Sequence, residues 1–209
     1  LQTRSGKRTS KSAVKIAVDM FEEKLISKKQ AVLRIDPVSL DTLLHPTLDE
    51  KSEIKVIAKG LPASPGAASG KVVFTSEEAE RLNGMMQDTI LVRVETSPED
   101  IQGMHAAKGI LTARGGMTSH AAVVARGMGR PCVSGSSEID INYEKKIFKT
   151  SDIQVKEGDL ITIDGSTGRI ILGNVPTVKP EISSDFSKLM SWADKIRKLK
   201  IRTNSETPA

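Results

Sequence analysis

The chain has 209 residues, 38% of them hydrophobic and 27% charged, which predicts one well-formed globular domain with flanking elements. The net charge is +5, but residues 61–173 hold 12 basic and 14 acidic side chains, and the chain has one Trp, one Tyr and four Phe. This distribution argues against a nucleic-acid partner, and no stretch approaches the ~18 apolar residues of a membrane span. We therefore expect neither a nucleic-acid partner nor a membrane partner. The single cysteine, Cys132, is expected to be a small buried side chain.

Helices are predicted before residue 55. A second helix is expected from Ser27, because Ser27-Lys28-Lys29-Gln30 matches a capping box, and a short third helix is expected to end before Pro46. These elements predict a helical hairpin that precedes the main domain. The first helix is expected over residues 10–29, with an apolar face formed by Val14, Ala17, Val18, Phe21 and Leu25.

Short β-rich runs follow and alternate with further helices. The runs lie at 54–60, 71–75, 89–95, 109–113, 131–135, 160–165 and 169–173, separated by Gly, Pro, Asn and Asp. Helices are expected at 76–83, 97–107 and 119–128. The fold class predicted from this alternation is mixed α/β. After the linker NVPTVKP, a last helix is expected within 183–200, with a stripe of Phe186, Leu189, Met190, Ala193 and Ile196.

A histidine follows a glycine pair at the start of the predicted helix over 119–128. Gly115 and Gly116 have no Cβ, so the backbone there can approach an anion closely. Thr118 or Ser119 is the expected N-cap, which places His120 in the first helical turn. A helix N-terminus offers backbone N–H groups and a partial positive charge. The stretch therefore predicts an anion site with a nucleophile inside it.

The residues alone leave three interpretations of His120 open. A phosphoryl group on imidazole is a labile phosphoramidate, whereas on a hydroxyl it is a stable ester, which favours a phosphoryl-carrier histidine. A capped structural helix with a hydrogen-bonded histidine fits the pattern too, as does a site for another anion. A metal site is disfavoured, because no second His, Cys or carboxylate lies at ligand spacing. Ser119 and His120 are adjacent, which does not suit a serine triad.

Three stretches resemble the pyruvate, phosphate dikinase family. Residues 110–135, ILTARGGMTSHAAVVARGMGRPCVSG, resemble its phosphohistidine signature, and residues 60–74 and 90–112 resemble other parts of its central domain. Enzyme I of the sugar phosphotransferase system and phosphoenolpyruvate synthase usually have Arg at the position of Met117, so the dikinase is the nearer match. The alternative is a standalone phosphocarrier or docking module related to those two enzymes.

The resemblance implies roles for single residues. His120 matches the histidine that takes the β,γ-pyrophosphoryl group of ATP, gives its terminal phosphoryl to phosphate and passes the rest to pyruvate, as a tele-phosphohistidine. Gly115, Gly116, Thr118 and Ser119 are the implied phosphoryl-binding residues. Thr118 also matches a threonine that a regulatory protein phosphorylates in plant members.

The resemblance also implies a domain order, with Gln2 and Arg4 as candidates for binding ATP at the end of an ATP-grasp domain. The implied parts are that end with a helical hairpin linker (1–54), a swivelling phosphohistidine β/β/α domain (55–174), a helical linker (175–200) and the first strand of a phosphoenolpyruvate-binding barrel (201–209).

The implied partners are the ATP-grasp and barrel domains of the same polypeptide, with ATP, phosphate and pyruvate as substrates. Without those domains the segment by itself is expected to be inactive. Mg²⁺ is implied for the full-length enzyme, with ligands outside this chain, and no metal ligand is expected within it. We expect the full-length enzyme to be a homodimer and to work in the cytoplasm.

Overall fold

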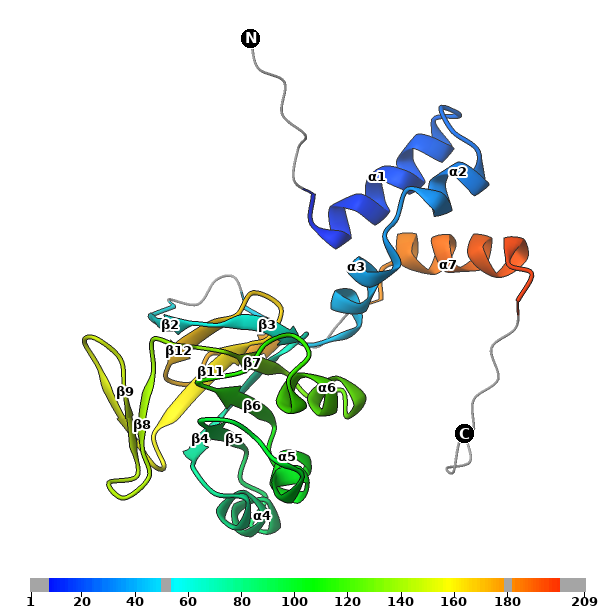
Figure 1. Cartoon of the computed structure of the whole chain (residues 1–209). Coiled ribbons are helices and arrows are strands. Elements are labelled where there is room, and N and C mark those ends of the chain that lie inside the picture. Colours follow the sequence, from blue (N-terminus) through cyan, green and yellow to red (C-terminus); the bar gives the residue numbers. More distant parts are fainter. Residues whose placement is uncertain (1–7, 50–53, 179–181, 200–209) are drawn as a thin grey trace. The chain divides into compact units, whose positions relative to one another are not determined.

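The computed structural model describes residues 8–49, 54–178 and 182–199. The chain divides into two compact units, one formed by Leu1–Leu44 with Glu181–Ala209 and the other by His45–Pro180 (Figure 1). We call these the helical unit and the central unit. The predicted ATP-binding candidates Gln2 and Arg4 and the predicted barrel strand over 201–209 lie outside the described residues.

An eight-stranded sheet organises the central unit. Its strand order is β2-β12-β11-β4-β5-β6-β7-β3. The strands are β2 (Val56–Lys59), β3 (Leu61–Ser64), β4 (Ala67–Val73), β5 (Thr89–Arg93), β6 (Gly109–Thr112), β7 (Cys132–Ser134), β11 (Leu160–Asp164) and β12 (Arg169–Leu172). The four neighbours β4, β5, β6 and β7 run parallel to one another. Parallel strands need long crossovers, and here these contain α4 (Ser76–Gly84), α5 (Ile101–Ala106) and α6 (His120–Gly127).

Successive residues of the parallel strands face opposite sides of this sheet. Leu91 packs with Met104 of α5 and Ala121 of α6. Its neighbour Ile90 packs with Phe148, which belongs to a second sheet of order β10-β9-β8. The strands of the second sheet are β8 (Asp140–Asn142), β9 (Ile147–Lys149) and β10 (Gln154–Lys156). The three layers confirm the predicted mixed α/β class and its β/β/α order (Figure 1).

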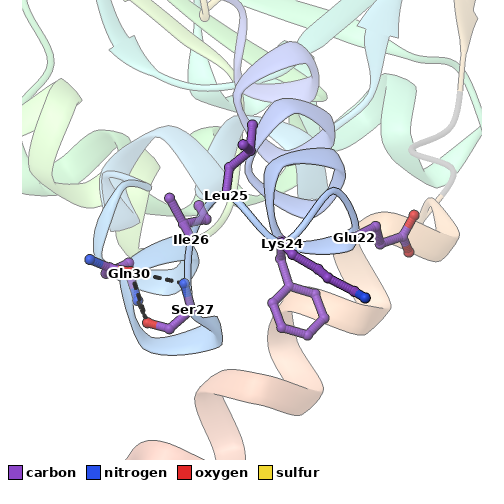
Figure 2. A pocket seen from close by; sticks show the side chains of 7 residues that line it. Glu22, Lys24, Leu25, Ile26, Ser27 and Gln30 are labelled. Atoms are coloured by element: carbon purple, nitrogen blue, oxygen red, sulfur yellow. Dashed lines mark hydrogen bonds between the residues drawn. The ribbon is translucent and has the colours of Figure 1, made fainter.

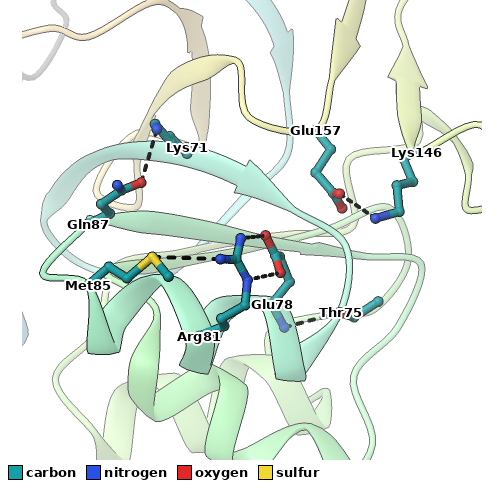
Figure 3. Close-up of polar contacts among 8 residues, drawn as sticks. All are labelled: Lys71, Thr75, Glu78, Arg81, Met85, Gln87, Lys146 and Glu157. Carbon is teal, nitrogen blue, oxygen red and sulfur yellow. Dashed lines mark hydrogen bonds and ion pairs between the residues drawn. The ribbon is translucent and has the colours of Figure 1, made fainter.

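Surface polar contacts fix the ends of α4 and of the second sheet (Figure 3). The Thr75 hydroxyl caps α4 by accepting from the backbone N–H of Glu78 at 3.2 Å. Within α4, Arg81 pairs with Glu78 at 2.6 Å, and this hydrogen bond lowers the pKa of the Glu78 carboxyl. In the second sheet, Lys146, just before β9, pairs with Glu157, just after β10, at 2.6 Å. Exposed pairs of this kind add little stability each.

The helical unit joins two segments that the sequence had suggested as separate linkers. Its elements are α1 (Ser10–Glu22), α2 (Lys28–Leu33), α3 (Pro37–Asp41), the 3₁₀ turn η1 (Thr42–Leu44) and α7 (Ser184–Ile196). Val18 of α1, Ala31 of α2 and Leu189 of α7 are buried in one cluster. The rings of Phe21 and Trp192 meet edge to face with centroids 4.6 Å apart. None of the described helices is long and apolar enough to cross a membrane.

The first helix is shorter than the predicted 10–29. Lys24 adopts a left-handed φ of 61°, so α1 ends and the chain turns there. Leu25, expected on the buried face, is 64% exposed for that reason. The predicted capping box is confirmed, because the Ser27 N–H donates to Gln30 Oε1 and the Gln30 N–H donates to Ser27 Oγ. Figure 2 shows the side chains that line a surface pocket at this turn.

The last helix also differs from the prediction. α7 ends at Ile196, before the expected limit of residue 200. Met190 and Ile196 were expected on its buried stripe but are 37% and 38% exposed, whereas Trp192 is buried. The helix turns its Leu189 and Trp192 side toward α1 and α2, and neither Met190 nor Ile196 belongs to that buried cluster.

The central unit extends further at both ends than the predicted 55–174. β1 (Thr47–Leu48) pairs antiparallel with β13 (Thr177–Val178), which brings together two segments that were assigned to the linkers. Leu48 and Val175 are buried with Ala67 in one cluster. Because these residues belong to the core of the central unit, its boundaries are His45 and Pro180.

Candidate functional site

The candidate site lies at the carboxyl ends of the parallel strands. β6 ends at Thr112, and the following loop leads directly into α6, whose first residue is His120. We call residues 115–119 the nucleophile loop. In parallel α/β sheets the strand carboxyl ends share one edge, and loops at that edge are the usual place for ligands.

Two glycines allow the nucleophile loop its close packing. Gly115 has a φ of +112°, and a Cβ added there would lie 3.0 Å from the Cβ of Ser119. Gly135, which follows β7, has a φ of +63°, and a Cβ there would lie 2.4 Å from the Gly115 carbonyl oxygen. Neither position therefore accepts a side chain without a shift of backbone. Gly116 differs, because an added Cβ would have no described heavy atom within 4 Å.

Ser119, not Thr118, is the N-cap of α6. Its backbone is extended, and its hydroxyl accepts from the backbone N–H of Ala122 at 3.4 Å. The Ser119 N–H donates to the Gly116 carbonyl at 3.1 Å, which closes a turn before the helix. Of the two expected N-caps, Ser119 is therefore the one that forms, and Thr118 lies within that turn with an exposed side chain. The first N–H groups of α6 have no acceptor within the helix.

Thr96 fixes the ring of His120. Its hydroxyl oxygen lies 3.0 Å from His120 Nδ1, and both residues are half-buried. When Nδ1 carries the proton, it donates to Thr96 Oγ1, and the lone pair is then on Nε2. This tautomer suits a nucleophile at the tele nitrogen. Sequence reasoning missed Thr96, whose only signal was a hydroxyl residue just after β5.

Further hydrogen bonds hold the segment that contains Thr96. The Val94 N–H donates to the Tyr143 hydroxyl at 2.8 Å, and the Val94 carbonyl accepts from the Arg114 N–H at 2.9 Å. On the other side of Thr96, the Ser97 N–H donates to the buried carboxylate of Asp100 at 2.9 Å. Thr96 is thus held from both sides, so its hydroxyl is preorganised toward His120.

The predicted phosphoryl-binding residues lie in one loop. Gly115, Gly116, Thr118 and Ser119 all precede His120 at the open end of α6, as the sequence required. Their roles stay predictions. Among the described residues, no group of three or more His, Cys, Asp or Glu side chains could hold a metal ion. The surface pocket at the turn between α1 and α2 and another along β9 and β10 are lined by none of the predicted site residues.

Part of the central unit matches a known protein family. Residues 85–168 match the family model described as "PEP-utilising enzyme, mobile domain". The matched segment lies within the central unit, which is therefore similar to the mobile domain of PEP-utilising enzymes. Both Thr96 and His120 fall inside the matched segment.

The whole chain is similar to proteins named pyruvate, phosphate dikinase. It is 61% identical over 209 residues to the protein of Rhizobium meliloti, covering 100% of this chain and 23% of the relative. Identity to the protein of Clostridium symbiosum is 56% over 210 residues, covering 100% of this chain and 24% of the relative. Identity to pyruvate, phosphate dikinase 1, chloroplastic, of Arabidopsis thaliana is 55% over 210 residues, covering 100% of this chain and 22% of the relative. The resemblance seen in the sequence is confirmed, and the chain spans about a quarter of the length of these relatives.

A solved structure also matches in part. The NMR solution structure of the Enzyme I (nEIt) protein is 25% identical, with a TM-score of 0.30, and the match covers 51% of this chain and 38% of that chain.

Proposed function

We propose that this chain is the phosphoryl-carrier segment of a pyruvate, phosphate dikinase. The observation that supports this most is the site itself. A histidine at the start of α6, with Nδ1 held by Thr96 at 3.0 Å, lies in a mobile domain whose whole chain is 61% identical to a protein of that name. The longer protein would interconvert ATP, phosphate and pyruvate with AMP, pyrophosphate and phosphoenolpyruvate.

In this proposal, His120 Nε2 carries the transferred group throughout and is the nucleophile of the first step. It attacks the β-phosphorus of ATP, the bond from that phosphorus to the α,β-bridging oxygen breaks, and AMP leaves. Phosphate then attacks the terminal phosphorus, so pyrophosphate leaves and one phosphoryl group stays on the nitrogen. The enolate oxygen of pyruvate takes this group, which gives phosphoenolpyruvate and free imidazole. The labile P–N bond makes histidine suited to this relay.

The chain's own residues would orient the ring and bind the phosphoryl oxygens. The Thr96 hydroxyl, 3.0 Å from Nδ1, would accept a hydrogen bond from the proton that Nδ1 carries and so keep the Nε2 lone pair available. The first backbone N–H groups of α6, with its partial positive charge, would receive the oxygens of the bound group. Gly116 leaves the approach to this helix end open, because it presents no side chain.

Substitution of His120 tests the proposal. In the full-length protein, His120→Asn should abolish both ATP/AMP exchange and pyruvate/phosphoenolpyruvate exchange, because both partial reactions use the same nitrogen. The matched control is His105→Asn, which replaces an exposed histidine of α5. This control should keep both exchanges. Retention of either exchange in His120→Asn would show that the phosphoryl group travels through another residue.

We further propose that the central unit moves between two sites in the longer protein. One imidazole cannot lie in an ATP pocket and a pyruvate pocket at once, so the carrier must travel. The pockets, the Mg²⁺ ligands and any dimer contacts would belong to parts of that protein outside this chain. An engineered disulfide that fastens the central unit at the ATP site should spare ATP/AMP exchange and stop pyruvate/phosphoenolpyruvate exchange until it is reduced. Full overall activity of the oxidised protein would exclude this motion.

A further inference from the structure

Arg126 forms a bridge from α6 to two other segments of the central unit. Its Nε donates to the carbonyl oxygen of Ala63 in β3 at 2.7 Å, and its Nη2 donates to the carbonyl oxygen of Met117 in the nucleophile loop. One planar guanidinium therefore joins a strand of the sheet to the loop that precedes His120. Arg126 has no role in the steps of the proposed phosphoryl transfer.

The Ala63 carbonyl is placed to receive this bond by an irregularity in the sheet. β3 pairs with β7 through Pro62 and Ser64, but the register shifts between these two residues, and Ala63 lies at the shift. A bulge of this kind takes a residue out of the regular ladder and redirects its backbone groups. Ala63 is buried, so its carbonyl requires a partner inside the protein, and Arg126 supplies it.

The nucleophile loop needs a hydrogen bond of this kind because its glycines give the backbone many accessible conformations. It contains Gly115 and Gly116, which lose more conformational entropy on ordering than other residues. Other contacts reach Gly116, whose carbonyl accepts from the Ser119 N–H at 3.1 Å and from Ser134 Oγ at 3.4 Å. The bond from Arg126 holds the next residue, Met117, whose side chain is 43% exposed.

We propose that Arg126 is a positioning residue for the reaction of His120, holding the nucleophile loop in the conformation that binds the phosphoryl group. The inference rests on the proposed function. The loop leads without interruption into the first turn of α6, so its displacement would move the N–H groups beside His120. A displacement of ~1 Å at such a site costs roughly 100-fold in rate.

Two substitutions distinguish the effect of the planar guanidinium group of Arg126 from the effect of its positive charge. Arg126→Lys keeps a positive charge but replaces the planar fork by a single ammonium group. Arg126→Ala removes both and leaves space for free guanidinium. The matched control is Arg130→Ala, since Arg130, three residues after α6, also donates to a backbone carbonyl at 2.9 Å, but to that of His105 and not to the nucleophile loop.

The test measures ATP/AMP exchange in the full-length protein. We expect both Arg126 variants to lower kcat roughly 10- to 100-fold with little change in the KM for ATP, and Arg130→Ala to match the wild type. Guanidinium ion at non-denaturing concentration should partly restore Arg126→Ala and leave the wild type unchanged. Hydrogen exchange of backbone amides 116–119 should be faster in the Arg126 variants than in Arg130→Ala.

Distinct results would overturn the inference. A wild-type kcat in Arg126→Lys, or an equal loss in Arg130→Ala, would remove the positioning role. The positioning role would also be excluded if the loss of activity equalled the unfolded fraction measured in thermal melts and guanidinium did not restore the activity. If Arg126→Ala does not fold, Arg126→Lys decides the question by its kcat and amide exchange. Persistence of exchange in His120→Asn would instead refute the proposed function.

Discussion

The hydrogen bond from Thr96 to His120 gives a quantitative prediction for the proposed reaction. Thr96→Val keeps the shape of a half-buried side chain and removes the oxygen that lies 3.0 Å from His120 Nδ1. A net contribution of about 0.5–1.5 kcal/mol for such a bond corresponds to roughly a 2- to 13-fold change in rate. His120 is only half-buried, so water can pair with Nδ1 after the substitution, and we expect a loss within this range.

The assay is ATP/AMP exchange in the full-length protein, with Thr96→Ser as the matched control. Thr96→Ser keeps the hydroxyl and should stay near the wild-type rate, whereas Thr96→Val should fall. In ¹⁵N-histidine spectra, Thr96→Val should also shift the tautomer population away from the form with a proton on Nδ1. An unchanged rate and tautomer population in Thr96→Val would refute the view that this hydroxyl orients the nucleophile.

Three further predictions concern other parts of the chain. Thr118→Asp should abolish exchange while Thr118→Ser keeps it, because a carboxylate in the nucleophile loop repels an incoming phosphoryl group; full activity of the aspartate form would contradict this. Burial raises the pKa of the Cys132 thiol to about 12. At pH 8, iodoacetamide should therefore alkylate this thiol roughly 10³-fold more slowly in the native protein than in the unfolded chain. Equal rates would show an accessible thiolate in the native protein. Trp192→Ala should destabilise the helical unit by about 3–5 kcal/mol in urea unfolding, whereas Leu199→Ala, at an 85% exposed side chain, should change little; equal effects would contradict the packing of α7 on α1.

Local signals in the sequence were enough to predict the elements that form the nucleophile site. Ser119, one of the two expected N-caps, caps α6, and the apolar residues Ala121 and Ala125 of this helix are buried. Pro98 begins the turn before α5, and Thr75 begins α4. These features depend on residues a few positions apart, so the sequence states them directly.

Features that depend on distant residues escaped prediction. Thr96 and His120 are 24 positions apart, and only the parallel pairing of β5 with β6 brings their loops together. The pairing of Thr47 with Val178 joins segments near the two ends of the central unit through strands of two residues each. Strands this short show no period in the sequence.

The second sheet was missed for a similar reason. β8, β9 and β10 have three residues each, and they mix exposed polar residues with buried ones such as Phe148 and Val155. Runs of this length are below the four to eight residues that distinguish a strand by its alternation. Their place in the fold is set by packing on the eight-stranded sheet, which only the assembled core defines.

The central claim is that His120 is the phosphoryl carrier, and the chemical stability of the enzyme-bound phosphate tests it most directly. Full-length protein incubated with β-³²P-labelled ATP should retain label that survives alkali and is lost in acid, as a phosphoramidate requires and a serine or threonine ester does not. Peptide mapping should place this label on the peptide that contains His120, and His120→Asn should take up none. Acid-stable label on Ser119 or Thr118, or undiminished label in His120→Asn, would contradict the account.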